Sequence, residues 1–108
     1  LNEIARSSGV AVVLEEERIP VDPEVQAACE LLGIDPLHVA NEGVFVACVP
    51  AEQAERALTA VQAQPAGAGA RRIGYVEASP ARRVLVRTTL GPMRIVAVPS
   101  GELLPRIC

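Results

Sequence analysis

Two residues of this sequence combine a reactive side chain with a suggestive position: Cys108, the last residue, and Glu42, in a central loop. Cys108 follows Pro105, Arg106 and Ile107. A thiol at the free end of a chain is a soft nucleophile that can be acylated, and little around it would block access to another protein's active site. The alternative is an incidental cysteine, because chain termini often carry no function.

The residues before Cys108 favour a tail over a further strand. Pro99, Ser100 and Gly101 end the last apolar segment, and about ten residues can extend roughly 30 Å from there. That length is enough to leave one domain and enter the site of another protein. We therefore expect residues 1–98 to form the domain and residues 99–108 to form a flexible tail that carries the cysteine.

Glu42 lies within the polar sequence Asn41-Glu42-Gly43, between a predicted helix and a predicted buried strand. A carboxylate at such a strand end could act as a general base. The same three residues are also typical of a turn that leads into a strand. On the residues alone, turn chemistry is the favoured interpretation.

The other candidate ligands and nucleophiles do not form a recognisable site. Cys29 and Cys48 fall on predicted core faces, and with Cys108 and His38 their spacing matches no zinc pattern, so no metal site is predicted. A Cys108–His38 nucleophilic pair is possible in space, but a lone loop histidine is more often a surface residue or a cap.

Composition excludes several function classes. The formal charge is −3, and all ten basic residues are arginines. Without lysine, Schiff-base chemistry and a P-loop lysine are excluded within this piece. Without a basic cluster or aromatic stacking residues, a nucleic-acid partner is not expected. No apolar run reaches the length of a membrane span, and three cysteines without CxxC spacing suit the cytoplasm.

Apolar patterning predicts the secondary structure in chain order. Residues 1–8 read as the end of a helix, and because the sequence starts there we expect a piece of a longer protein. Continuous apolar runs predict central strands at 10–14 and 44–49. A helix is predicted from Pro23, with Asp22 as N-cap, and its expected buried face consists of Val25, Ala28, Cys29 and Leu32.

The second half of the sequence predicts one helix and three strands. The helix spans residues 51–62, and the strands span 72–78, 83–89 and 93–98, the last two as a hairpin around Gly91-Pro92. Glu15-Glu16-Glu17 reads as a solvated strand end. The order predicts an α+β fold with a mixed β-sheet, packed helices and some ferredoxin-like character.

Two stretches resemble a known family. Residues 33–43, GIDPLHVANEG, and residues 105–108, PRIC, are similar to the C-terminal domain of the hydrogenase maturation family HypE, within the aminoimidazole ribonucleotide synthetase-related superfamily. The resemblance extends over the helix from Pro23 and over residues 44–62. It implies a synthetase-type C-terminal α/β sandwich that ends in an extended cysteine-bearing tail.

The resemblance also implies a function in [NiFe] hydrogenase maturation. In that family a carbamoyltransferase, HypF, carbamoylates the terminal thiol. ATP and Mg²⁺ then support dehydration to a thiocyanate, and cyanide passes to iron on a HypC–HypD complex. An N-terminal ATP-binding domain mediates homodimerisation.

Carried onto this sequence, the resemblance makes Cys108 the carbamoyl acceptor and Glu42 the catalytic base. The ATP-binding domain lies outside these residues, so the piece alone is expected to be inactive and to hold no cofactor. No ATP-binding residue can be assigned. The alternatives are a non-catalytic interaction domain and the equivalent domain of another synthetase of the superfamily.

Overall fold

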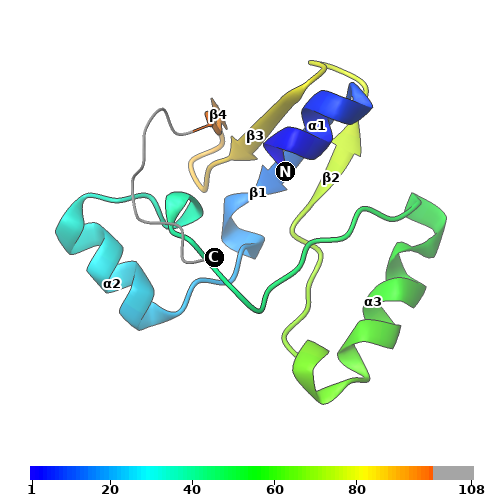
Figure 1. Ribbon diagram of the computed structural model, residues 1–108, viewed down its shortest axis with the longest axis horizontal. Coiled ribbons are helices and arrows are strands. Elements are labelled where there is room, and N and C mark those ends of the chain that lie inside the picture. The colour runs from blue at the N-terminus through cyan, green and yellow to red at the C-terminus, as the bar shows by residue number, and fades with distance from the viewer. Residues whose placement is uncertain (99–108) are drawn as a thin grey trace.

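The computed structural model describes residues 1–98, which form a four-stranded mixed sheet with three α-helices (Figure 1). The helices are α1 (Asn2–Ser8), α2 (Pro23–Leu32) and α3 (Ala54–Gln62), and the strands are β1 (Ala11–Glu15), β2 (Gly74–Glu77), β3 (Arg83–Arg87) and β4 (Met93–Ile95). Short 3₁₀ helices are η1 (Glu16–Arg18), η2 (Pro36–His38), η3 (Ala51–Gln53) and η4 (Pro65–Gly67). The predicted α+β class with a mixed sheet is confirmed.

The strand order is β2-β1-β3-β4, so β1 and β3 are the central strands. They run parallel, with Val12 opposite Val84 and Leu14 opposite Val86. The outer strands pair antiparallel, β2 with β1 and β4 with β3. The predicted central strand at the beginning of the chain and the predicted C-terminal hairpin are both confirmed.

The core lies on one face of these central strands. It is formed by small and β-branched side chains, and its buried members are Ala5, Val12, Leu14, Val84, Val86 and Val96. Helix α1 covers this face, and its Asn2 Nδ2 donates a hydrogen bond to the Val96 carbonyl oxygen at 3.1 Å. Val13 and Leu85 are also buried, so both faces of the central pair are excluded from water.

The structure contradicts the packing predicted for helix α2. The helix begins after Asp22 and ends before Gly33 as expected, but Cys29 is its only buried residue. Val25 and Leu32 are 41% and 68% exposed. Helices α2 and α3 both stand away from the sheet in Figure 1, so the amphipathic pattern of α2 located the helix correctly but not its partner. No helix within residues 1–98 is long and apolar enough to cross a bilayer.

The predicted strand at residues 44–49 is also wrong. The segment is not part of the sheet, and Val44 and Phe45 are 70% and 73% exposed. Cys48, expected in the core, is exposed. A strand requires a neighbour that satisfies its backbone hydrogen bonds, and within the described residues this segment has no ladder partner. The apolar composition could not reveal that lack.

A glycine permits the close approach of β2 to β1. Gly74 lies opposite Leu14 in the antiparallel ladder, and a Cβ built there would overlap the Val13 carbonyl oxygen. We predict that Gly74→Ala lowers the free energy of unfolding by about 1–3 kcal/mol, because the backbone must shift to relieve the overlap.

Denaturant unfolding of the purified chain tests this prediction. Gly69→Ala is the matched control, because a Cβ there meets no atom within 4 Å. Equal stability of the two variants would contradict the prediction.

Candidate functional site

Glu42 lies on the chain segment that connects α2 to α3, and its side chain is exposed. Gly43 follows with φ of 78°, a left-handed conformation that favours glycine. The backbone bends at Gly43, but the segment that follows is not the strand into which the turn interpretation led. The bend does not exclude chemistry, because the exposed carboxylate is free to meet a substrate.

The turn η2, shortly before Glu42, is built by Asp35. Its Oδ1 accepts a hydrogen bond from the Leu37 backbone N–H at 2.9 Å, as an N-cap does, and Pro36 supplies the first helical position. The backbone N–H of His38 donates to the Asp35 carbonyl oxygen at 2.9 Å. Leu37 packs against the core cluster.

An arginine of the sheet connects this turn to the end of β1. Arg94 Nη2 lies 2.8 Å from Asp35 Oδ2 and 3.9 Å from Glu16 Oε1. Glu16 Oε2 in turn accepts a hydrogen bond from the Thr89 backbone N–H at 3.0 Å. Glu16, Arg94 and Asp35 therefore link η1, β4 and the loop that leads to Glu42.

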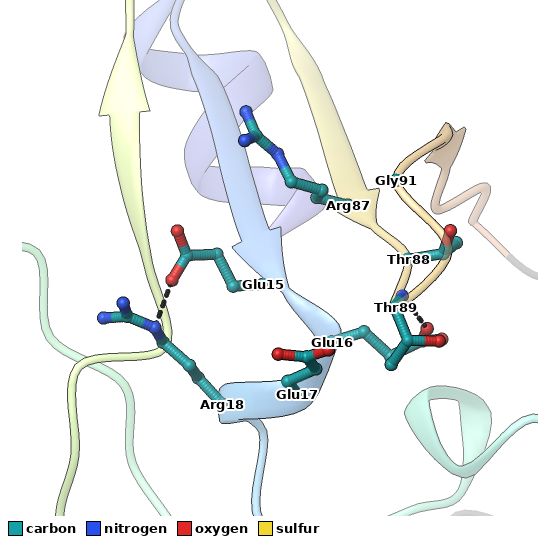
Figure 2. A pocket seen from close by; sticks show the side chains of 8 residues that line it. All are labelled: Glu15, Glu16, Glu17, Arg18, Arg87, Thr88, Thr89 and Gly91. Carbon is teal, nitrogen blue, oxygen red and sulfur yellow. Dashed lines mark hydrogen bonds and ion pairs between the residues drawn. The ribbon is translucent and has the colours of Figure 1, made fainter.

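A cavity of about 290 Å³ lies beside this link, where β1 and β3 end (Figure 2). Parallel strands bring their carboxyl ends to the same edge of a sheet, which is where ligands bind in many open sheets. Glutamates, arginines and the β3–β4 loop form its walls: Glu15, Glu16, Glu17, Arg18, Arg87, Thr88, Thr89 and Gly91.

The prediction that Glu15-Glu16-Glu17 form a solvated strand end is only partly confirmed. Glu17 is exposed, but Glu15 and Glu16 are half-buried. Glu15 forms an ion pair with Arg18, and the two side chains point toward each other in Figure 2. Glu16 holds the β3–β4 loop through Thr89.

The other predicted candidates are Cys108 and His38. Cys108 lies outside the described residues. His38 is half-buried, and its Nε2 is buried without a hydrogen-bond partner among residues 1–98. In this part of the chain no group of three or more histidine, cysteine, aspartate or glutamate residues could hold a metal ion.

Sequence reasoning missed the connecting residues Arg94 and Asp35. Asp35-Pro36 does carry a recognisable cap signature, because Pro after an Asp is frequent at helix starts. Arg94 gave no signal, since an arginine on an outer strand is ordinarily a solvated residue. Its importance depends on which loop lies beside it.

Comparison with known proteins gives consistent matches over the chain. The family described as AIR synthase related protein, C-terminal domain, matches residues 1–87. The carbamoyl dehydratase HypE of Cupriavidus necator is 55% identical over 108 residues, which are 100% of this chain and 31% of that protein.

Two solved structures agree with this match. A crystal structure of the hydrogenase maturation protein HypE in complex with ATP has a TM-score of 0.88 at 40% identity, covering 100% of this chain and 33% of that one. A crystal structure of a HypE–HypF complex has a TM-score of 0.80 at 41% identity, covering 92% and 32%. The chain thus spans about a third of the length of these relatives.

The different burial of the two described cysteines predicts different reactivity. Cys48 is exposed, whereas Cys29 is 5% exposed. We expect a water-soluble thiol reagent to alkylate Cys48 in the folded 108-residue chain well before Cys29, which should react only on unfolding. Peptide mass mapping over time measures both rates, and a Cys29 rate equal to that of Cys48 would contradict the described packing of α2.

Proposed function

This chain belongs to the AIR synthase related family as its C-terminal domain, and from that premise we propose that it is the C-terminal part of a HypE-type carbamoyl dehydratase of [NiFe] hydrogenase maturation. The observation that carries the proposal is the 55% identity to a carbamoyl dehydratase HypE over all 108 residues. Because the chain covers about a third of that relative, the activity belongs to the longer protein.

In this proposal Cys108 is the carbamoyl acceptor and residues 99–108 are the tail that delivers it. A HypF-type carbamoyltransferase transfers the carbamoyl group to the thiol sulfur, and the thiol proton is lost. The crystal structure of a HypE–HypF complex supports such an encounter. Accepting the group requires a nucleophilic sulfur, which the thiol of Cys108 would supply.

Dehydration then removes one oxygen and two protons from the carbamoyl group. ATP transfers its γ-phosphoryl group to the carbonyl oxygen and ADP is released, which converts the oxygen into a leaving group, and the nitrogen loses its first proton. The C–O bond then breaks, phosphate departs, and loss of the second N–H proton leaves a thiocyanate on sulfur. Glu42 is proposed as the base that accepts a proton from nitrogen, a role for which a carboxylate within reach of the N–H suffices.

The ATP site is proposed to lie in the part of the longer protein outside this chain. The ATP-bound structure of a HypE supports the nucleotide. Mg²⁺ would supply charge neutralisation for the phosphates. Homodimerisation through the same N-terminal part completes the proposed enzyme.

The final acceptor is proposed to be iron on a HypC–HypD complex. The C–S bond breaks, the Cys108 thiolate departs and an Fe–C bond forms. Its electron pair comes from the iron, which is formally oxidised by two electrons, so the step requires an iron centre that the HypC–HypD complex supplies in a reduced state. A non-catalytic interaction domain and the corresponding domain of another synthetase are the alternatives. The identity to carbamoyl dehydratases of the HypE family over the whole chain favours the carbamoyl dehydratase over both alternatives.

The acceptor role predicts a site-specific covalent adduct. After the full-length protein is incubated with HypF, carbamoyl phosphate and ATP, mass spectrometry should find one carbamoyl group on the peptide that contains Cys108. Cys108→Ala should abolish it. Cys48→Ser is the control, because Cys48 is an exposed thiol in this domain and should not be required. An adduct on Cys48, or none with an active partner, would overturn the acceptor assignment.

The base role predicts a defect in dehydration alone. Glu42→Gln keeps the size of the side chain but removes its basicity, so we expect thiocyanate formation to fall by about 10²-fold or more. Loading of Cys108 should proceed as in the wild type. Single-turnover measurement on the carbamoylated full-length protein tests this, and a normal rate would exclude Glu42 as the base.

A further inference from the structure

The segment between α2 and Glu42 has few anchors on the sheet. Helix α2 buries only Cys29 and therefore does not fix the segment by packing. From residue 40 to residue 50 every side chain is exposed. The start of the segment is fixed by η2, because Leu37 packs against the core cluster and Asp35 pairs with Arg94.

Asp35 uses its two carboxylate oxygens for two purposes. Oδ1 caps η2 through the Leu37 N–H at 2.9 Å, and Oδ2 lies 2.8 Å from Arg94 Nη2. The shape of the turn and its attachment to the sheet therefore depend on one side chain. A further hydrogen bond, from the Val39 N–H to the Pro36 carbonyl oxygen at 3.2 Å, carries the ordered backbone to within three residues of Glu42.

Arg94 is itself held by the strands. It sits in the middle of β4, opposite Val86 in the antiparallel ladder with β3. Glu16, the first residue of η1 and the residue after β1, is its second acidic neighbour and accepts a hydrogen bond from the Thr89 N–H. Arg94 therefore presents its guanidinium to Asp35 from a fixed backbone position.

We propose that Arg94 and Asp35 are a positioning pair, which holds the loop so that the Glu42 carboxylate reaches the substrate nitrogen. This inference rests on the proposed function of Glu42. Neither residue of the pair touches the reacting atoms. Both side chains are partly exposed, at 36% and 27%, so solvent screening limits what the pair contributes to overall stability. The pair instead positions Glu42, and the catalytic rate depends far more strongly on that position than the overall stability does.

The test uses the full-length protein and two conservative changes. Asp35→Asn keeps an oxygen that caps η2 but loses the charge, and Arg94→Gln removes the guanidinium. Each should lower the single-turnover rate of thiocyanate formation about tenfold, with Cys108 loading and the KM for ATP within about twofold of wild type. Arg94→Lys, which retains the positive charge, should restore most of the rate.

Combination with Glu42→Gln distinguishes positioning from general damage. If Arg94 acts through Glu42, Arg94→Gln should cause no further loss in the Glu42→Gln protein, because the group it positions is already inactive. Arg83→Gln is the matched control, an exposed arginine at the start of β3, and should dehydrate at the wild-type rate. Thermal unfolding of every variant identifies any that fail to fold. If Arg94→Gln fails to fold, the rates of thiocyanate formation by Asp35→Asn and Arg94→Lys test the pair.

The outcomes distinguish failure of the Arg94–Asp35 positioning pair from failure of Glu42 as the base. A slow Glu42→Gln protein with wild-type rates in Arg94→Gln and Asp35→Asn would overturn the positioning pair and leave the base assignment intact. If Arg94→Gln lowered the rate of thiocyanate formation by the same factor in the wild-type protein and in the Glu42→Gln protein, the positioning pair would also be overturned. A normal rate in Glu42→Gln would remove both.

Discussion

The parallel pairing of β1 with β3 is the interaction on which the rest of the structure depends. It aligns Val12 with Val84 and Leu14 with Val86, and these four side chains form most of the core beneath α1. Because the strands run in the same direction, their carboxyl ends meet at one edge. That edge brings Glu16 beside Thr89 and so fixes the acidic neighbour of Arg94.

Different interactions stabilise the domain and position the loop that carries Glu42. Apolar burial in the central strands holds the domain together, and burial is the dominant favourable term in folding. The loop that carries Glu42 receives little of it. Its position instead depends on a partly exposed ion pair and a capped turn, which contribute little energy but define direction. Such an arrangement suits the role proposed for Glu42, that of a base that meets a substrate carried on another part of the protein.

Sequence patterns predicted the elements better than their partners. The apolar run at 10–14 identified β1, and Asp22 and Gly33 marked the ends of α2, because these signals are local. The same kind of run at 44–49 failed, since pairing is a property of the neighbours and not of the segment. The proposal of Glu42 came from its loop sequence, whereas Arg94 depends on a contact between residues 59 positions apart in the chain and left no local signal.

The long connection between the two central strands has a consequence for the order of folding. β1 ends at Glu15 and β3 begins at Arg83, so most of the domain forms the loop that their pairing must close. Closing such a loop costs entropy before the core contacts compensate for it. During synthesis β1 therefore cannot pair with β3 until nearly the whole domain has been made. Its four consecutive apolar residues, which are buried in the folded chain, remain open to aggregation until then.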